Sequence, residues 1–237
     1  MKQKSYKLFK RCIDIIFSGM SLFILFPFFI IIALAIKFDS SGPVFYKQKR
    51  LGKNGVEFKM YKFRSMVVGA ENMGAGLYNY ENDPRVTRVG KFLRNTSIDE
   101  LPQLINVLRG DMSIVGPRPP VVNELGDYNT LNKRYKKRFT VLPGITGLAQ
   151  VEGRNSITWD RKVNYDNLYI ELVKSKGLWI DFEIILRTIL NIFKKKDIYE
   201  KKIKIEMTNE ESAKAAEAEV IAKAHAKESE DLVQISD

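Results

Sequence analysis

The stretch TSIDELPQL (residues 96–104) brings two adjacent carboxylates to the expected start of a helix. Leucine and isoleucine then recur at helical spacing, and Gly110 follows as a stop signal. Ser97 and Glu100 have the spacing of a capping box, in which each side chain bonds the backbone N–H of the other. Pro102 is tolerated only within the first turn, so the predicted helix starts between positions 97 and 99.

The carboxylate pair, Asp99 and Glu100, stands at the positive end of this predicted helix. Free backbone N–H groups and the helix dipole favour negative charge there. The setting is expected to keep Asp99 ionised, as a nucleophile or a metal ligand requires. The alternative is that both acids serve only capping and solubility, because a short motif alone is a weak hypothesis.

The charge of the chain is positive and unevenly spread. Its 237 residues carry a formal net charge of +11, and 45% of them are hydrophobic, which suffices for one packed domain with appendages. Residues 206–237 contain nine acids and three lysines, a net of −6, which leaves +17 on residues 1–205. So basic a body is expected to meet an anionic partner: phosphates, a lipid surface or nucleic acid.

Cysteine and histidine occur once each. The single cysteine, Cys12, excludes an intrachain disulfide. The single histidine, His225, lies in the acidic tail, which excludes a His/Cys zinc site and a Ser-His-Asp triad in the body. Any catalysis must therefore use carboxylates, lysine, arginine, hydroxyls or a hard metal ion.

Residues 15–36 form an uncharged run that is rich in Phe, Ile and Leu. As a helix, these 22 residues extend about 33 Å, enough for the hydrocarbon core of a bilayer. The run is long for a signal peptide, and no small-residue cleavage site follows it. A membrane segment is therefore expected in preference to a buried helix of a soluble protein.

Lysine and arginine flank this run on both sides, which constrains its topology. The positive-inside rule places both flanks in the cytoplasm, and a re-entrant hairpin satisfies it where a straight span does not. Pro27 lies near the middle and can set the bend, and Ser18 and Ser21 are candidates to satisfy the freed backbone groups. A kinked single span with a short external N-terminus is the alternative, and the sequence favours the re-entrant form only slightly.

A β-hairpin is predicted directly after the membrane segment. Residues 44–50 and 56–63 alternate in strand fashion around a Gly-Lys-Asn-Gly turn. The basic side chains of this hairpin are Lys47, Lys49, Arg50, Lys59, Lys62 and Arg64. They fit a solvated sheet face and a surface for lipid headgroups about equally well.

Further cations approach the carboxylate pair from both sides in the sequence. Arg85, Arg88 and Lys91 have helical spacing, and Arg94 follows them. Arginine presents a planar fork to phosphate oxygens, so this segment is a candidate phosphate clamp, with a solvated helix face as the alternative.

A second candidate clamp follows a short predicted strand at residues 110–115. Arg118 lies in the loop Gly-Pro-Arg-Pro-Pro, whose prolines fix the backbone and aim the side chain. Arg154 offers one more cation beyond the glycine-containing loop at residues 143–148.

The remaining segments predict loops and helices. Residues 69–84 are rich in Gly and Asn and indicate a mobile lid or an insertion. Residues 131–139 form a basic run expected to face phosphate or lipid. Residues 178–193 form an amphipathic, strongly apolar helix that suits a membrane interface, although packing on the core is the default. The tail from Thr208 is expected to be helical or disordered.

Five motifs resemble, in this order, those of the bacterial sugar transferases, the monotopic phosphoglycosyl transferases, and most closely their small single-domain members. The motifs are Tyr61-Lys62-Phe63-Arg64-Ser65-Met66, Ser97-Ile98-Asp99-Glu100-Leu101-Pro102-Gln103, Gly110-Asp111-Met112-Ser113, Gly116-Pro117-Arg118-Pro119 and Pro143-Gly144-Ile145-Thr146-Gly147. The resemblance covers about residues 7–193, and such an ordered set is not expected by chance.

This resemblance implies a reaction and a role for each motif. The family transfers a sugar 1-phosphate from a UDP-sugar to undecaprenyl phosphate, releases UMP, uses Mg²⁺ and forms a covalent phosphosugar–enzyme intermediate. Carried over by motif, Asp99 is the nucleophile and Glu100 its acid/base partner, and both are candidate Mg²⁺ ligands. Arg94 and Arg118 are expected to hold phosphates, and Pro27 matches the family's break in a re-entrant helix. Lys62, Arg88 and Arg154 are further candidate phosphate-binding residues.

The expected protein is α+β and mainly helical. We expect a membrane-inserted re-entrant helix at residues 1–38, a catalytic domain with the hairpin and interface-lying helices at residues 39–205, and an acidic tail at residues 206–237. Its expected location is the cytoplasmic face of the bacterial inner membrane, without a nucleic-acid partner. The sugar of the donor and a homodimer are left open.

Two alternatives to this enzyme remain. A non-catalytic membrane-surface adaptor, which holds anionic lipid or nucleic acid, predicts that changes at Asp99 and Glu100 are tolerated. A degenerate, inactive copy of the enzyme is the other, and the intact motifs argue against it.

Overall fold

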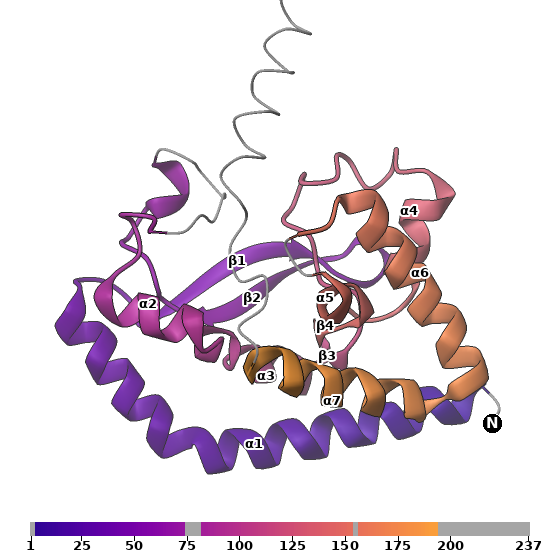
Figure 1. Ribbon diagram of the computed structural model, residues 1–237, viewed down its shortest axis with the longest axis horizontal. Helices are drawn as coiled ribbons and strands as arrows, with labels where there is room; N and C mark the ends of the chain where they lie inside the picture. The colour runs from indigo at the N-terminus through magenta and orange to yellow at the C-terminus, as the bar shows by residue number, and fades with distance from the viewer. Residues whose placement is uncertain (1–2, 74–81, 154–155, 194–237) are drawn as a thin grey trace, which may run out of the picture. The chain divides into compact units, whose positions relative to one another are not determined.

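The computed structural model describes residues 3–73, 82–153 and 156–193. Most of these residues are helical, and the strands form two sheets of two strands each (Figure 1). The predicted mainly helical α+β class is therefore confirmed. The predictions for the acidic tail, for Arg154 and for residues 74–81 of the expected lid lie outside the described residues.

The N-terminal helix α1 (Gln3–Asp39) contains the whole apolar run. Figure 1 shows that this ribbon is continuous but bends part-way along, and Pro27 lies inside the helix. A proline removes one helical hydrogen bond and crowds the preceding turn, which accounts for such a bend. Ser18 does not satisfy a freed backbone group as predicted, because its Oγ is buried without a hydrogen-bond partner among the described residues.

Strands β1 (Phe45–Leu51) and β2 (Glu57–Phe63) form the predicted antiparallel hairpin. Phe63 at the end of β2 is almost fully buried. It meets Phe29 of α1 edge-on, with ring centroids 5.0 Å apart, and stacks on Phe45 at 5.4 Å. These aromatic contacts join the hairpin to the second half of α1.

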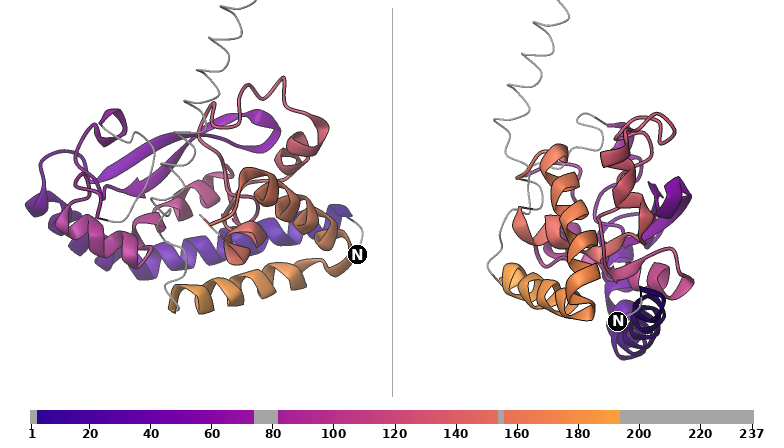
Figure 2. Two further views of the ribbon diagram at one scale, coloured as in Figure 1. Left: turned by 45° about the horizontal axis from the view of Figure 1, so that its top comes forward. Right: turned by 90° about the vertical axis from the view of Figure 1, so that its right-hand side faces the viewer.

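The segment with the carboxylate pair lies beneath the hairpin. It consists of α2 (Arg88–Asn95), the 3₁₀ turn η3 (Ile98–Glu100) and α3 (Gln103–Arg109). Helix α3 contacts both α1 and β2 and so lies between them (Figure 2). Gly110 ends α3 in the left-handed conformation, with a φ of 91°, which confirms the predicted stop signal.

Side chains of α1 cap the helices on either side of the carboxylates. Asp39 Oδ2 accepts the N–H of Val89 in the first turn of α2, at 2.9 Å. Arg11 donates to the carbonyls of Val107 and Leu108 in the last turn of α3, at 2.6 and 3.0 Å. Because helix ends leave backbone groups unpaired, these contacts tie both helices to α1.

The second half of the chain forms a separate layer around a parallel strand pair. Its elements are β3 (Ser113–Val115), α4 (Lys133–Lys137), the 3₁₀ turn η4 (Arg138–Thr140), β4 (Gly144–Thr146), α5 (Leu148–Glu152), α6 (Trp159–Lys176) and α7 (Leu178–Phe193). A core of Val115, Leu148, Tyr169, Ile180 and Ile184 joins β3 to the last three helices. The helix predicted at residues 178–193 is confirmed.

The start of α7 is attached to the start of α1. Asp181 Oδ2 accepts hydrogen bonds from the Tyr6 hydroxyl at 3.0 Å and from Lys10 Nζ at 2.9 Å, while its Oδ1 accepts one from the Tyr169 hydroxyl at 2.7 Å. From this junction α7 extends in the same general direction as α1 in Figure 1, and the right-hand view of Figure 2 shows the two helices separating. The apolar helix and the C-terminal layer are thereby held together.

Gly144 is a point where the backbone leaves no room for a side chain. A Cβ at this position would lie 2.1 Å from the backbone nitrogen of Gly116 and 2.4 Å from the carbonyl oxygen of Thr146. We expect Gly144→Ala to lower the free energy of unfolding by about 3 kcal/mol, because the paired strands must separate. Thermal unfolding measures this loss. Gly19→Ala, with no atom within 4 Å of its Cβ, is the control, and equal stability of both variants would contradict the packing described here.

Candidate active site

The carboxylate pair lies in a 3₁₀ turn and does not begin a regular α-helix. Ser97 has a left-handed φ of 58° and makes no side-chain cap hydrogen bond, and α3 begins only after Pro102. The predicted capping box and helix start are therefore wrong. A proline has no N–H to donate, so the chain reaches it through tight turns before the α-helix forms. A left-handed serine costs of order 1 kcal/mol, and such strain collects at functional sites.

Asp99 is buried, with 7% of its surface exposed. The pKa of this carboxyl is raised to about 6, chiefly by burial and also by the charge of Glu100, while Lys62, Arg94 and Arg118 oppose the rise. The prediction that Asp99 is ionised gave the wrong cause, because burial outweighs the surrounding positive charges and raises its pKa. Near neutral pH the side chain is still mainly a carboxylate.

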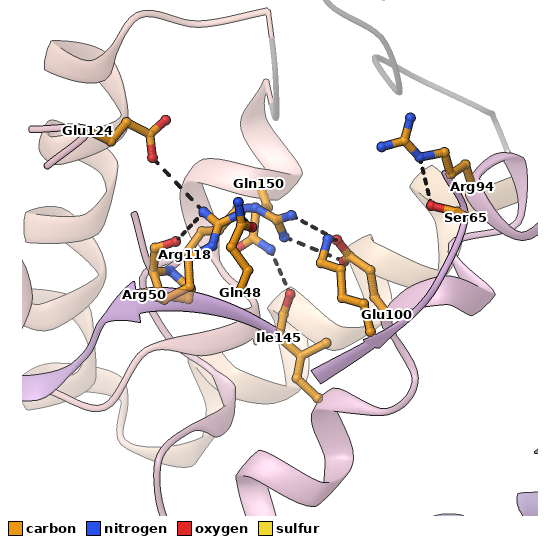
Figure 3. Close-up of polar contacts among 11 residues, drawn as sticks. Gln48, Arg50, Ser65, Arg94, Glu100, Arg118, Glu124, Ile145 and Gln150 are labelled. Carbon is orange, nitrogen blue, oxygen red and sulfur yellow. Dashed lines mark hydrogen bonds and ion pairs between the residues drawn. The ribbon is translucent and has the colours of Figure 1, made fainter. Parts of the chain in front are cut away.

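Glu100 lies between two cations. Its Oε1 accepts hydrogen bonds from Lys62 Nζ and Arg118 Nη2, both at 2.8 Å, and Arg118 Nη1 approaches Oε2 at 3.4 Å (Figure 3). The planar guanidinium fork therefore faces the carboxylate as it would face a phosphate. Glu100 raises the pKa of Arg118, whereas burial lowers that of Lys62. The structure thus brings three predicted site residues, from β2, η3 and the loop after β3, into one cluster with Asp99.

Arg50 is a further cation beside this cluster. It donates to the carbonyl of Pro119 at 3.0 Å and to Gln48 Oε1 at 2.6 Å (Figure 3). Burial and the charge of Arg118 lower its pKa to about 10. The prediction placed Arg50 on a solvated or lipid-facing surface, which is wrong. Strand alternation is a signal for this placement. Lys62 pairs with Tyr46, and residues 46, 48 and 50 alternate onto one face, so Gln48 and Arg50 share a sheet face with Lys62.

Arg64 also does not lie on the predicted basic surface of the hairpin. Its guanidinium is buried and donates to the carbonyls of Ile36, Ser40 and Ser41 at 3.3, 2.6 and 2.6 Å. It therefore caps the C-terminal end of α1, where unpaired carbonyls and the helix dipole favour a cation. Lys47, Lys49 and Lys59 remain exposed on the hairpin.

The arginines that precede the carboxylates are not equivalent. Arg94, half-buried in α2, donates from Nε to Ser65 Oγ at 3.1 Å (Figure 3) and lowers the pKa of Asp99. Arg88 is exposed at the first residue of α2 and pairs with no carboxylate among the described residues. Arg85 precedes α2 and is buried in an ion pair with Asp83 at 2.7 Å, so the predicted common helical face is wrong.

The residues present can accommodate a magnesium ion together with a phosphate. Within the ranges that the structure describes, no group of three or more His, Cys, Asp or Glu residues converges. Mg²⁺ is commonly held by one or two protein carboxylates plus substrate phosphates, so Asp99 and Glu100 fit in kind. Asp99 is the better-placed ligand, because Glu100 is already paired with Lys62 and Arg118.

Known sequences resemble most of this chain. The chain is 45% identical over 196 residues to a UDP-glucose:undecaprenyl-phosphate glucose-1-phosphate transferase of Klebsiella pneumoniae, an alignment that covers 81% of this chain and 41% of the relative. It is 39% identical over 213 residues to an undecaprenyl-phosphate galactose phosphotransferase of Salmonella typhimurium, covering 84% and 43%. The chain thus spans about two fifths of the length of these curated relatives.

A profile of the family described as bacterial sugar transferase matches residues 5–195. The match includes α1 from residue 5 onward, the hairpin, the carboxylate cluster and the helices α5, α6 and α7. The resemblance stated from the motifs is confirmed: the chain belongs to the bacterial sugar transferase family.

Proposed function

We propose that this protein transfers a sugar 1-phosphate from a UDP-sugar to undecaprenyl phosphate and releases UMP, as the first membrane step of glycan assembly. The observation that carries this proposal is Asp99, a buried carboxylate with a raised pKa beside Lys62, Arg94 and Arg118. Phosphoryl transfer needs a positioned nucleophile and several cations around the phosphate oxygens. The names of the relatives support the donor and the acceptor.

In the first half of the proposed reaction, a carboxylate oxygen of Asp99 attacks the sugar-bearing phosphorus of the donor. A bond forms between that oxygen and phosphorus, the bond from phosphorus to the bridging oxygen breaks, and UMP leaves. The result is an aspartyl-phosphosugar, which splits one difficult displacement into two easier ones. Arg118 and Arg94 bind phosphate oxygens and hold the donor in line with Asp99.

In the second half, an oxygen of undecaprenyl phosphate attacks the same phosphorus and Asp99 leaves as a carboxylate. Glu100 takes up any proton carried by the attacking phosphate. A donor phosphate competes with Glu100 for Arg118, so substrate binding weakens the ion pair and leaves Glu100 able to accept that proton.

Mg²⁺ is part of this proposal. Asp99 would hold it, with Glu100 as a second ligand, and the ion would neutralise charge on the phosphates of the donor. The residues of the chain do the remaining work: they exclude water around Asp99 and orient the phosphates.

The proposed location of the protein is the cytoplasmic face of the bacterial inner membrane. Residues 5–39 of α1 are long and apolar enough to cross a bilayer by length and composition, and little of this stretch is buried by the rest of the chain. We place residues 1–38 in the membrane as a re-entrant helix bent at Pro27, and residues 39–205 outside it as the catalytic domain. The exposed apolar stripe of α7 would lie at the interface; it consists of Trp179, Phe182, Leu186, Ile189 and Leu190.

The single native cysteine provides a direct test of the re-entrant form. Cys12 is exposed near the N-terminal end of α1. In whole cells a membrane-impermeant maleimide is expected to leave Cys12 unlabelled, and likewise a cysteine at the exposed position 53 in a Cys12→Ser, Lys53→Cys variant. Both sites should react after lysis. Labelling of Cys12 alone in intact cells would instead show a single kinked span.

The pH dependence of transfer reports on the nucleophile. A protonated Asp99 cannot attack phosphorus, so kcat/KM is expected to fall below pH 6, approaching about tenfold per pH unit. Bound Mg²⁺ favours the carboxylate and moves this limb to lower pH, so the profile should shift with metal concentration. A rate that stays constant between pH 7 and pH 4 at every Mg²⁺ concentration would rule out Asp99 as the titrating nucleophile.

Incubation of the purified protein with undecaprenyl phosphate, Mg²⁺ and a panel of UDP-sugars tests the function itself. Release of UMP with one or more donors is the expected result. Donor alone should label the protein covalently, because the first half-reaction needs no acceptor. Absence of UMP release and of labelling across the panel would reject the proposal.

A further inference from the structure

A buried ion pair joins the turn η4 to helix α6. Arg138 Nε donates to Asp166 Oδ2 at 2.8 Å, and each side chain is 2% exposed. The sequence predicted that the basic run at residues 131–139 faces phosphate or lipid, which is wrong for Arg138. Its partner lies 28 residues further along the chain, so local sequence gives no sign of the pairing.

The same guanidinium reaches the loop that carries Arg118. Arg138 Nη2 donates to the backbone carbonyl of Arg118 at 2.6 Å. The neighbouring carbonyl of Pro117 accepts the N–H of Gly144 at 2.9 Å, and both arginines line one crevice with Pro117 and Pro119. Arg118 is thus fixed at its backbone by Arg138 while its own guanidinium faces Glu100.

Stability alone does not account for this pair. Burial raises the pKa of Asp166 even though the Arg138 guanidinium lies beside it. Arg138 Nη1 is also buried with no hydrogen-bond partner among the described residues, although the Trp159 ring lies 5.1 Å from the guanidinium carbon. Buried ion pairs of this kind contribute little to stability and can instead specify one geometry.

We infer that Arg138 is a positioning residue: anchored by Asp166, it holds the Arg118 carbonyl so that the Arg118 guanidinium stays aimed at Glu100 and at the phosphate of the donor. This inference rests on the proposed function, because the aim of Arg118 matters only if Arg118 binds substrate. Arg138 itself touches no reacting atom.

The chain contains a matched control for this pair. Arg134 lies one helical turn before Arg138 and pairs with Asp160 of α6 at 3.1 Å, with side chains 45% and 66% exposed. Both pairs therefore join the segment formed by α4 and η4 to helix α6. Of these two arginines, Arg138 donates to the Arg118 carbonyl, whereas Arg134 donates to Asn164 and to the Asp160 carbonyl. Exposed pairs contribute little, so Arg134→Gln is expected to leave transfer within about twofold of wild type.

The test compares kcat and donor KM of Arg138→Gln, Arg138→Lys, Asp166→Asn and Arg134→Gln, with the melting temperature of each. Arg138→Gln is expected to lower kcat/KM by about 10- to 100-fold and to raise donor KM, as loss of an aimed arginine does. Arg138→Lys keeps the charge without the fork and should recover part of the activity. If Arg138→Gln does not fold, Asp166→Asn, which keeps Arg138, is expected to give a smaller loss of the same kind.

A double variant distinguishes positioning from a general structural role. If Arg138 acts through Arg118, Arg118→Gln with Arg138→Gln should be no worse than Arg118→Gln alone, within about twofold. Losses that multiply, or a loss no larger than that of Arg134→Gln, would overturn the inference. Inactive wild-type protein would instead reject the proposed function, which the parallel wild-type assay shows separately.

Discussion

Asp99→Asn is expected to reduce sugar-phosphate transfer by at least about 10³-fold and to abolish covalent labelling by donor. An amide oxygen is a poor nucleophile toward phosphorus and a weaker magnesium ligand than a carboxylate. The substitution is nearly isosteric, so the buried turn η3 should keep its shape. UMP release and radiolabelled donor measure the two outcomes.

The same substitution is expected to raise the melting temperature. The folded-state pKa of Asp99, about 6, lies above the ordinary value of 3.8 for an aspartate. The carboxyl therefore destabilises the fold increasingly as the pH rises from about 4 to 6, and this penalty is complete above pH 6. Asparagine removes this penalty. The free energy of unfolding should therefore rise by an amount on the order of 1–3 kcal/mol at pH 7 and should not change at pH 3.

Asp127→Asn is the control for both effects. This aspartate lies in an exposed loop and accepts the N–H of Asn129, which an amide oxygen can also accept. The activity and melting temperature of Asp127→Asn should match those of the wild-type protein. Normal transfer in Asp99→Asn would favour the non-catalytic adaptor, and an unchanged melting temperature would contradict the cause assigned to the raised pKa.

Arg118→Gln is expected to lower kcat/KM by about 10²- to 10³-fold and to raise donor KM. The substitution removes the guanidinium fork that we propose binds phosphate. It also leaves Glu100, a largely buried carboxylate, with one of its two described cationic partners. Lower thermal stability should therefore accompany the kinetic loss. Steady-state kinetics across donor concentrations separate the effect on KM from that on kcat.

Arg118→Lys and Arg109→Gln sharpen this test. Lysine keeps the charge without the planar fork, so its activity should lie between those of wild type and Arg118→Gln. Arg109 is an exposed arginine of α3 that donates to the Tyr61 hydroxyl at 2.6 Å, away from the carboxylates, and its loss should change kcat/KM less than threefold. Equal losses in Arg109→Gln and Arg118→Gln would mean that only total positive charge matters.

Local pattern predicted the elements whose residues depend mainly on their neighbours in sequence. The hairpin followed from strand alternation around a turn, and α7 followed from its apolar periodicity. Gly110 ended α3 as predicted because a left-handed residue after a helix strongly favours glycine. The carboxylates and Arg118 were identified as candidates from motif order.

The remaining features depend on partners that are distant in sequence. Arg50, Arg64 and Arg138 looked like surface cations, yet each is directed inward by carbonyls from another segment. The residues of η3 have helical spacing, which predicts an α-helix, whereas Pro102 displaces the helix start. No single-sequence pattern encodes the 28-residue separation between Arg138 and Asp166.

The buried cap on α1 has a consequence for the acceptor lipid. Arg64 follows directly after β2, the strand that contains Lys62. Its guanidinium donates hydrogen bonds to the carbonyls of Ile36 and Ser40 at the end of the apolar helix. With α1 seated as proposed, the depth of that helix sets the height of the reacting groups above the hydrocarbon. A lipid phosphate resides at a nearly constant level in the headgroup layer, so a thinner or thicker bilayer would misalign the acceptor while leaving the water-borne donor unaffected.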